Sequence, residues 1–297
     1  HLLEAGARVR IPVHQRQPHR TAANIELIEA DLTRMEDCHR CCREVDYVFH
    51  AAGGVGAAGI SQAQIIANVT SNLTLTANAL QSASEAKVKR ILVFSSSTAY
   101  PPADHAVQED EFWSADPWPG YHGYGWMRRY TERLAEYVHN TTDINVAIVR
   151  PGALYGPRDN FDLATCHVVP ALIRKAVERL HPFKVWGDGN DVRDFLHIAD
   201  LARGCLMMLE NKADCDPVNI AYGEGVTVRD LVKIIVEEAK YENASLEFDS
   251  SKPSALPIRL MNTEKAMRDI DFQPKITIRE GIRETIEWYQ SVSQDSL

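Results

Sequence analysis

Two side chains that can take part in proton transfer stand four residues apart near the middle of the chain. They are Tyr124 and Arg128, and a serine-rich segment, 95–100, precedes them. On a helix, residues four apart lie on one face. A free phenol has a pKa of about 10, so a tyrosine that works as a general acid or base near neutral pH needs a neighbouring cation. With a serine hydroxyl facing both, such a trio can move a proton at a substrate oxygen while a hydride moves at carbon.

The segments around these residues alternate between short apolar runs and amphipathic stretches. Nearly continuous apolar strands that alternate with helices are typical of a parallel sheet covered on both faces. We therefore predict an α/β, doubly wound (Rossmann-type) fold, whose ligands bind beyond the carboxyl ends of the strands. Gly6 is expected to end a helix that occupies the first residues. The predicted strands are 7–13, 25–32, 45–50, 90–94 and 144–150, and the predicted helices are 35–43, 61–86 and 125–139.

The second half of the chain has a looser pattern. Helices are expected at 168–180, 227–240 and 277–291, a short strand at 246–248, and a strand followed by a helix at 195–209. We expect a smaller C-terminal substrate domain here. The predicted boundaries are 1–161 for a dinucleotide-binding domain, with 193–222 returning to it, and 162–297 for the substrate domain.

Charge and cysteine content narrow the class of protein. The formal net charge is −9, which argues against a nucleic-acid-binding protein, and no apolar run is long enough to span a membrane. Cys38, Cys41 and Cys42 form a cluster, but no second Cys/His pair follows at zinc-finger spacing, so no metal is expected. Cysteines of this kind are typical of a reducing compartment, so we expect a cytoplasmic protein.

Several further motifs occur in a fixed order along the chain. This order resembles the extended short-chain dehydrogenase/reductases (the NAD-dependent epimerase/dehydratase family), and most closely the GDP-L-fucose synthases, which are GDP-4-keto-6-deoxymannose epimerase/reductases. The resemblance implies a nucleotide-sugar oxidoreductase or epimerase that uses a nicotinamide cofactor. The stretches that carry it are 51–56, 96–101, 150–161, 166–172, 185–189, 193–197 and 251–253.

The resemblance assigns catalytic roles. It implies that Tyr124 is the general acid/base and that Ser96 is the hydroxyl that orients the sugar 4-oxygen. Thr98 falls where the fucose synthases have a cysteine used in epimerisation. His167 falls where they have the acid/base histidine of the same step, and Arg128 falls where the family has lysine.

Substrate contacts are also implied. Arg193 matches a substrate-binding arginine and is expected to pair with a diphosphate, and Asn160 is expected to hold the sugar or its phosphates. The full set of expected substrate-binding residues is Ser97, Asn160, His167, Lys175, Trp186, Arg193 and Arg259.

Two departures from the family pattern bear on activity. Arg128 keeps the positive charge of the lysine, but arginine does not readily release a proton and its planar fork needs different room. Thr98 is a much weaker acid than a thiol. A simple reductase or a 4-epimerase is therefore more plausible than a 3,5-epimerase.

The cofactor residues are assigned by resemblance as well. Asp31 and Leu32 are expected to flank the adenine, and Asn68 to support the nicotinamide half. Arg16 follows the second strand of the family fold, where arginine suits a ribose 2′-phosphate, so NADP is favoured, with NAD as the alternative. The other expected cofactor contacts are Ala51, Ala52, Gly53, Tyr124, Arg128 and Pro151.

The glycine-rich GxxGxxG loop of the family lies ahead of the first residues of this chain. We expect that the first strand and this loop are absent from the chain as given. Because glycine backbone N–H groups at a helix N-terminus normally meet the pyrophosphate, we expect weak NADP binding from this sequence alone.

Two other functions stay open. One is a UDP-sugar 4-epimerase with tightly held NAD. The other is a non-catalytic NADP-binding relative, suggested by Arg128. A dehydratase is less favoured, because Thr98-Ala99 replaces the Asp-Glu pair that those enzymes use. In relatives, helices such as 61–86 and 125–139 form a two-fold, four-helix interface, so a homodimer is expected.

Overall fold

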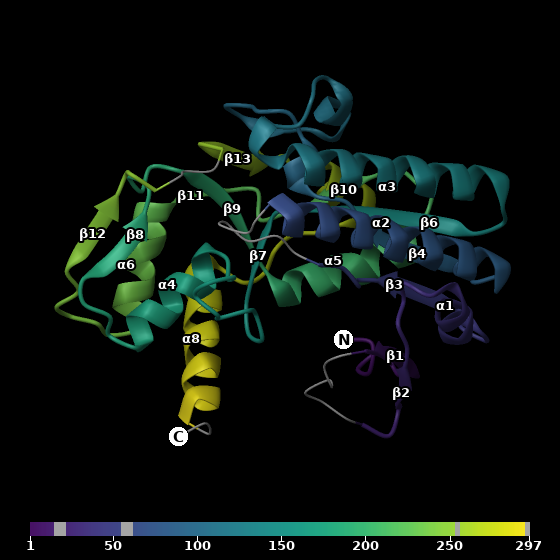
Figure 1. Cartoon of the computed structure of the whole chain (residues 1–297), viewed down its shortest axis with the longest axis horizontal. Coiled ribbons are helices and arrows are strands. Elements are labelled where there is room, and N and C mark those ends of the chain that lie inside the picture. The colour runs from purple at the N-terminus through teal and green to yellow at the C-terminus, as the bar shows by residue number, and fades with distance from the viewer. Residues whose placement is uncertain (15–21, 55–61, 253–255, 295–297) are drawn as a thin grey trace.

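A parallel sheet forms the centre of the protein. The computed structural model describes residues 1–14, 22–54, 62–252 and 256–294. In the sheet, the strand order is β10 (Val218–Ile220), β6 (Asn145–Pro151), β4 (Arg90–Phe94) and β3 (Tyr47–His50), and each neighbouring pair is parallel. Figure 1 shows this sheet between the long helices.

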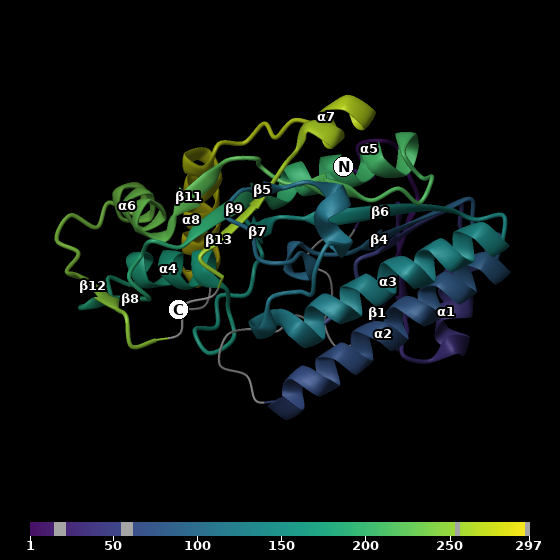
Figure 2. The same cartoon turned by 90° about the horizontal axis from the view of Figure 1, so that it is seen from above.

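The two faces of the sheet are both covered, which explains the apolar strands. Ile91 and Val93 of β4 pack with α2 (Gln62–Glu85) and α3 (His122–Thr141). Leu92 points the other way and packs with α5 (Ile198–Asn211). Alternate residues of a strand face opposite sides, so a strand between two helical layers must be apolar at every position. Figure 2 shows α2 and α3 on one side of β4 and β6 and α5 on the other.

The first strands stand apart from this sheet. β1 (Val9–Val13) and β2 (Ile25–Glu29) pair in parallel with each other as a separate two-stranded sheet. In place of the helix end expected in the first residues, residues 2–6 form turns, in which the Ala5 amide donates to the His1 carbonyl at 2.9 Å and the Ala7 amide to the Leu2 carbonyl at 3.0 Å. The left-handed conformation expected of Gly6 is confirmed, with φ of +77°.

The cysteine-rich segment forms a helix, α1 (Met35–Cys42), which packs on α2. Cys38, Cys41 and Cys42 are buried, and burial raises the pKa of the Cys38 thiol to about 12 and that of Cys42 to about 11. These thiols therefore stay protonated. In the described ranges, no group of three or more His, Cys, Asp or Glu side chains could hold a metal ion, and no helix is long and apolar enough to cross a membrane.

A second sheet is centred on β9 (Val192–His197). It pairs in parallel with β13 (Ile258–Met261) and β7 (Ala153–Tyr155), and antiparallel with β11 (Gly225–Thr227). β13 also pairs with β5 (Ala106–Val107). Three short 3-10 segments, η1 (Ser97–Ala99), η2 (Glu109–Trp113) and η3 (Pro119–Tyr121), connect β4 to α3 by way of β5.

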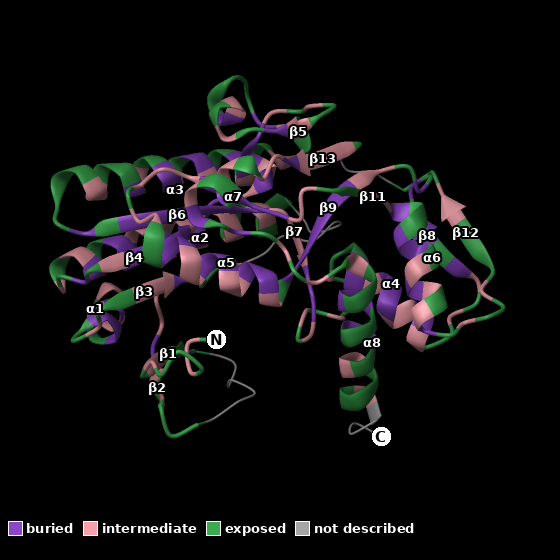
Figure 3. Ribbon diagram, turned by 180° about the vertical axis from the view of Figure 1, so that it is seen from behind, coloured by how far each residue is buried: buried purple, intermediate pink, exposed green. Residues whose placement is uncertain are grey.

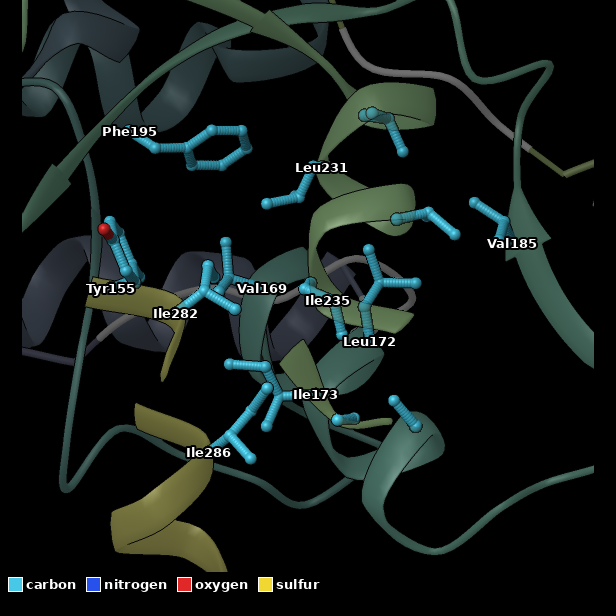
Figure 4. Close-up of a cluster of buried hydrophobic side chains, with 14 of the residues drawn as sticks. Tyr155, Val169, Leu172, Ile173, Val185, Phe195, Leu231, Ile235, Ile282 and Ile286 are labelled. Atoms are coloured by element: carbon cyan, nitrogen blue, oxygen red, sulfur yellow. The ribbon is translucent and has the colours of Figure 1, made fainter. Parts of the chain in front are cut away.

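The C-terminal helices enclose a separate apolar core (Figure 4). α4 (Val168–Val177), α6 (Val228–Glu238) and α8 (Ile278–Gln294) each contribute one apolar face to it, beside the pair of parallel strands β8 (Phe183–Trp186) and β12 (Leu246–Asp249). A shorter helix, α7 (Glu264–Ile270), packs beside β10 and α5. The predicted doubly wound α/β fold is confirmed, and the domain boundaries stay a prediction.

A buried ion pair joins β6 to α3. The Arg150 guanidinium donates two hydrogen bonds of 2.8 Å to the Glu132 carboxylate, and the two side chains are 3% and 5% exposed. Arg150 also donates to the hydroxyl of Tyr100 and lies 3.6 Å from the centre of the Phe112 ring. Figure 3 shows the buried surface concentrated in these inner strands and on the inward sides of the helices.

We expect Arg150→Met to lower the free energy of unfolding by about 3–5 kcal/mol, because it leaves the Glu132 carboxylate buried without its partner. Arg133→Met is the control, since Arg133 forms an exposed ion pair with Glu136, and such pairs contribute about 0–1 kcal/mol. Urea denaturation of both variants provides the measurement. Equal losses in the two variants would contradict this account of α3.

Candidate active site

The serine-rich segment follows the carboxyl end of β4. Ser96 is the residue before η1, and its hydroxyl oxygen accepts hydrogen bonds from the Thr98 amide (3.1 Å) and the Thr98 hydroxyl (2.9 Å). Because Ser96 accepts in both bonds, its own proton can be donated to a substrate oxygen. Ser97 and Ser95 are buried, and the Ser95 hydroxyl has no hydrogen-bond partner among the described residues.

Tyr124 lies in the first turn of α3, close to the first turns of α2. The Asn68 side-chain amide donates a hydrogen bond of 3.2 Å to the Tyr124 hydroxyl. Asn68 therefore touches the tyrosine that the sequence assigns to acid/base chemistry. A donor at this position stabilises negative charge on the phenol oxygen.

Arg128 lies one turn further along α3 and reaches the end of β4. It donates a hydrogen bond of 2.9 Å to the Phe94 carbonyl. Burial lowers the pKa of Arg128, and the neighbouring Tyr124 acts in the opposite direction. The guanidinium stays charged, since arginine keeps its proton in proteins. The site thus retains a cation beside the tyrosine although the family lysine is replaced.

His50 is buried at the end of β3, near Arg128. Its ring lies 3.2 Å from the Thr76 hydroxyl of α2. Burial, and then the charge of Arg128, lower the pKa of His50 to about 4. His50 is therefore neutral near pH 7, and Arg128 is the cation that faces Tyr124.

The loop after β3 carries Ala51, Ala52 and Gly53, which are all exposed. The Asn72 side chain of α2 holds this loop: it accepts from the Gly54 amide at 2.9 Å and donates to the Gly54 carbonyl at 2.8 Å. Asn72 is not among the site residues predicted from the sequence. Its signal is an amide on the buried side of a helix, one turn after Asn68.

The other expected cofactor residues lie at strand ends. Asp31 follows β2, and its carboxylate accepts hydrogen bonds from the Thr33 hydroxyl and amide, which lower its pKa. The adjacent Leu32 offers its carbonyl to Cys38. Pro151 is buried at the end of β6. Arg16, the basis for favouring NADP, lies outside the described residues.

Arg193 and Arg259 stand side by side. They are direct partners in the parallel pair β9 and β13. Arg193 is buried, bonds the carbonyls of Val192 and Pro257, and pairs with Asp191 at 3.2 Å. Burial and then the Arg259 charge lower the pKa of Arg193.

Arg259 connects this pair to the serine segment. Its guanidinium lies 5.7 Å from the centre of the Tyr121 ring, just before α3. Arg259 and Ser97 both line one small cavity. The structure therefore brings the arginine pair and the end of β4 to the same region.

The loop before α4 carries Asn160 and His167. The Asn160 amide donates to the Thr165 hydroxyl at 2.9 Å. His167 is the residue before α4; the surrounding protein lowers its pKa, while the charge of Asp159 raises it and that of Arg259 lowers it. The charge of Arg259, one member of the arginine pair, thus acts on His167.

Among the described residues, the contacts of Lys175, on α4, and of Trp186, on β8, do not involve Tyr124. Lys175 donates to the Lys184 carbonyl of β8 at 2.8 Å, and burial lowers its pKa. Trp186, also on β8, is half exposed, with the Lys252 ammonium 5.8 Å from its ring centre. Both residues therefore belong to the β8 edge of the C-terminal half.

The fold is of the dinucleotide-binding type, with Tyr124 at the start of α3 and the Arg193–Arg259 pair on β9 and β13. A model of the NAD-dependent epimerase/dehydratase family matches residues 1–221, so the chain belongs to this family.

Among curated relatives, GDP-L-fucose synthase 1 of Arabidopsis thaliana is 31% identical over 268 residues, which cover 88% of this chain and 82% of the relative. A dTDP-4-dehydro-6-deoxy-D-allose reductase of a Streptomyces species is 32% identical over 248 residues, 83% of this chain and 74% of the relative. The resemblance to fucose synthases expected from the motifs is confirmed.

Solved structures agree on the fold. UDP-glucose 4-epimerase of Thermotoga maritima, with UDP-glucose, superimposes with a TM-score of 0.86 at 23% identity and covers 98% of this chain and 94% of that one. A GDP-L-fucose synthetase of Naegleria fowleri bound to NADP gives a TM-score of 0.80 at 21% identity, over 91% of this chain and 86% of that one.

The low pKa of His50 predicts a pH dependence of stability. The folded protein keeps His50 neutral down to about pH 4, whereas an unfolded histidine takes up a proton near pH 6.5. His50 therefore costs no stability above pH 6.5 and lowers it progressively as the pH falls towards 4. Between pH 7 and pH 5 the loss is about 2 kcal/mol, and His50→Gln should remove it, as urea unfolding at the two pH values would show.

His105→Gln is the control with the opposite sign. Hydrogen bonds to Glu111 and Asp104 raise the pKa of the exposed His105. The stability that protonated His105 contributes is present below pH 6.5 and is lost as the pH rises. The variant lacks this gain at low pH, so it should lose more stability on acidification than the wild type does. The assignment for His50 is wrong if His50→Gln leaves the acid-dependent loss unchanged.

Proposed function

We propose that this chain is a GDP-L-fucose-synthase-like oxidoreductase/epimerase of a nucleotide diphosphate sugar, with reduction of a 4-keto group by NADPH as its main reaction. The single observation that carries the proposal is the pairing of Arg193 with Arg259 in the register of β9 and β13. The relatives that share up to about a third of the sequence act, by their names, on GDP- or dTDP-linked deoxysugars.

The arginine pair is suited to a diphosphate. Like charges directly opposite each other on neighbouring strands are destabilising, and Arg193 is buried as well. An anion bound between the two guanidinium groups relieves both costs, and arginine forks match phosphate oxygens in geometry. A diphosphate held here leaves the sugar to extend past Ser97 towards Ser96 and Tyr124.

The reduction needs one proton and one hydride at the 4-position. A nicotinamide cofactor, when bound, would supply the hydride to carbon. Tyr124 gives its phenolic proton to the sugar 4-oxygen, and Ser96 donates a hydrogen bond that orients the same oxygen. Arg128 and the Asn68 amide stabilise the phenolate that remains.

Epimerisation is the weaker part of the activity. It requires removal of a proton beside the keto group, for which Thr98 and His167 are the available groups. The Thr98 hydroxyl is engaged with Ser96 and is a poor acid. Reduction without 3,5-epimerisation is therefore our second candidate, and the similarity to a dTDP-sugar reductase favours it.

The residues around the strand ends suit a nicotinamide dinucleotide. The Ser95 hydroxyl is buried without a partner among the described residues, so it can accept a cofactor group. Asp31, the exposed loop Ala51–Gly53, Pro151 and Arg128 would hold the remaining parts. We propose NADP, with NAD as the alternative.

The assay that tests the function follows NADPH absorbance in the presence of GDP-4-keto-6-deoxymannose, with a chain extended at its front by a strand and a GxxGxxG loop, because weak NADP binding is expected from the sequence as given. We expect NADPH oxidation with this sugar and none with UDP-glucose. Tyr124→Phe should lower turnover by about two to four orders of magnitude, because the proton donor is lost, without loss of NADPH binding.

Other outcomes separate the alternatives. Interconversion of UDP-glucose and UDP-galactose with bound NAD would replace the proposal by a UDP-sugar 4-epimerase. Binding of NADPH with no turnover of either sugar would indicate a non-catalytic relative.

We also propose a homodimer formed through α2 and α3. These helices lie side by side, and Figure 2 shows them at one margin of the molecule. Large apolar side chains on them are exposed: Trp126, Tyr130 and Tyr137 of α3, at spacings of a helical face, and Ile66 of α2. Such an apolar stripe is typical of a helix that packs against a partner.

We also propose a cytoplasmic location, because the six cysteines are free thiols, as is typical of a reducing compartment.

We expect Tyr130→Asp to convert the dimer to a monomer in analytical ultracentrifugation, because a charge buried in the interface would lack a partner. Tyr47→Asp is the matched control, since Tyr47 is equally exposed but lies on β3. A wild-type chain that sediments as a monomer at micromolar concentration would disprove the proposed dimer.

A further inference from the structure

A second arginine of α3, Arg129, is buried next to the proposed catalytic group. Its side chain is 2% exposed. The guanidinium donates one hydrogen bond of 3.0 Å to the Ala99 carbonyl and another of 2.5 Å to the Ala115 carbonyl. Ala99 ends η1, the turn that carries Thr98 and follows Ser96. Arg129 thus joins the helix of Tyr124 to the turn of Ser96.

Aromatic rings, and no ion-pair partner among the described residues, surround the planar guanidinium group of Arg129. Its guanidinium carbon lies 5.5 Å from the ring centre of Phe112, 5.3 Å from that of Trp113 and 5.1 Å from that of Trp126. No carboxylate of the described segments lies within 4 Å of it. Burial is the main cause that lowers its pKa. A buried cation held by carbonyls and rings costs desolvation energy, so an apolar residue would serve packing better.

The backbone of α3 also approaches the backbone of η1 closely at Gly125. At Gly125, one turn before Arg129, a Cβ atom would lie 2.5 Å from Pro117 and 3.1 Å from the Thr98 carbonyl. Gly125 follows Tyr124 directly. Close contact at Gly125 and the two hydrogen bonds of Arg129 therefore define the distance between η1 and the start of α3.

We infer that Arg129 is a positioning residue for the reduction: it sets the separation between the Ser96–Thr98 turn and Tyr124. The inference rests on the proposed function for its catalytic consequence. Ser96 and Tyr124 must reach the same substrate oxygen, and an error of about 1 Å in such a geometry costs up to about a hundredfold in rate. Two hydrogen bonds from one planar fork fix both segments at once, which a lysine, with a point charge, does not do.

Arg129→Ala tests the inference, with Arg133→Ala as the matched control. Arg133 lies one turn further on α3, is exposed, and also stacks on Trp113, at 4.3 Å. With GDP-4-keto-6-deoxymannose and NADPH, we expect Arg129→Ala to lower kcat roughly tenfold to a hundredfold, with KM changed by less than about threefold. Millimolar guanidinium chloride, but not sodium chloride, should restore turnover by filling the space of the lost fork.

Hydrogen exchange measured by mass spectrometry gives a readout that needs no substrate. In Arg129→Ala, segments 95–101 and 112–118 should exchange faster, and guanidinium should restore their protection. Arg133→Ala should leave both segments as in the wild type. If Arg129→Ala does not fold, Arg129→Lys takes its place, with loss of protection in one segment and a smaller decrease in kcat expected.

Each result decides the inference. Unchanged exchange in both segments overturns it, and so does faster exchange with wild-type kcat, which would make Arg129 a purely structural tie. If the wild type reduces no keto sugar, the proposed function fails. The guanidinium-reversible opening of the two segments then still decides whether Arg129 holds the turn to the helix.

Discussion

The site depends on how the backbone just beyond β4 is held to α3. At this point the chain leaves the sheet, so carbonyl groups lose their strand partners, and a buried carbonyl without a partner is costly. Consecutive arginines of α3 meet this need. Arg128 binds the Phe94 carbonyl, and Arg129 binds that of Ala99. The same contacts place Ser96 between the strand end and the start of the helix.

This constraint explains why the arginine at position 128 is compatible with the fold. A lysine ammonium is a point charge, whereas a guanidinium can bond a carbonyl and keep further N–H groups for other partners. The bond to Phe94 uses part of the fork, and the charge remains next to Tyr124. In the proposed acid/base group, the replacement of the family lysine therefore preserves the positive charge next to Tyr124 and changes the part that depends on proton release.

Much of the central layer could be predicted from the sequence, because its strands are buried on both faces and read as apolar runs. β4 was predicted with its observed limits, Arg90–Phe94. α3 begins three residues earlier than predicted, at His122, because η3 leads directly into it. Strands such as β5 and β13 have only two or four residues, and their pairing depends on contacts between distant segments that no local pattern reveals.

The candidate site follows the same division. Residues carried by motifs, such as Tyr124 and Ser96, could be named from sequence, and their grouping follows from parallel strands that end at one edge. Arg129 could not, since it donates to backbone carbonyls of segments far away in the chain, and a backbone acceptor leaves no mark in the sequence.

Charge placement gives the last constraint. The chain has a net charge of −9, yet Arg193 and Arg259 lie side by side on β9 and β13. Burial, and then the charge of Arg259, lower the pKa of Arg193, so both disfavour its charged form. The Asp191 carboxylate and two backbone carbonyls compensate only part of this cost, since the pKa of Arg193 is still lowered. The diphosphate proposed above would gain from both guanidinium groups at once.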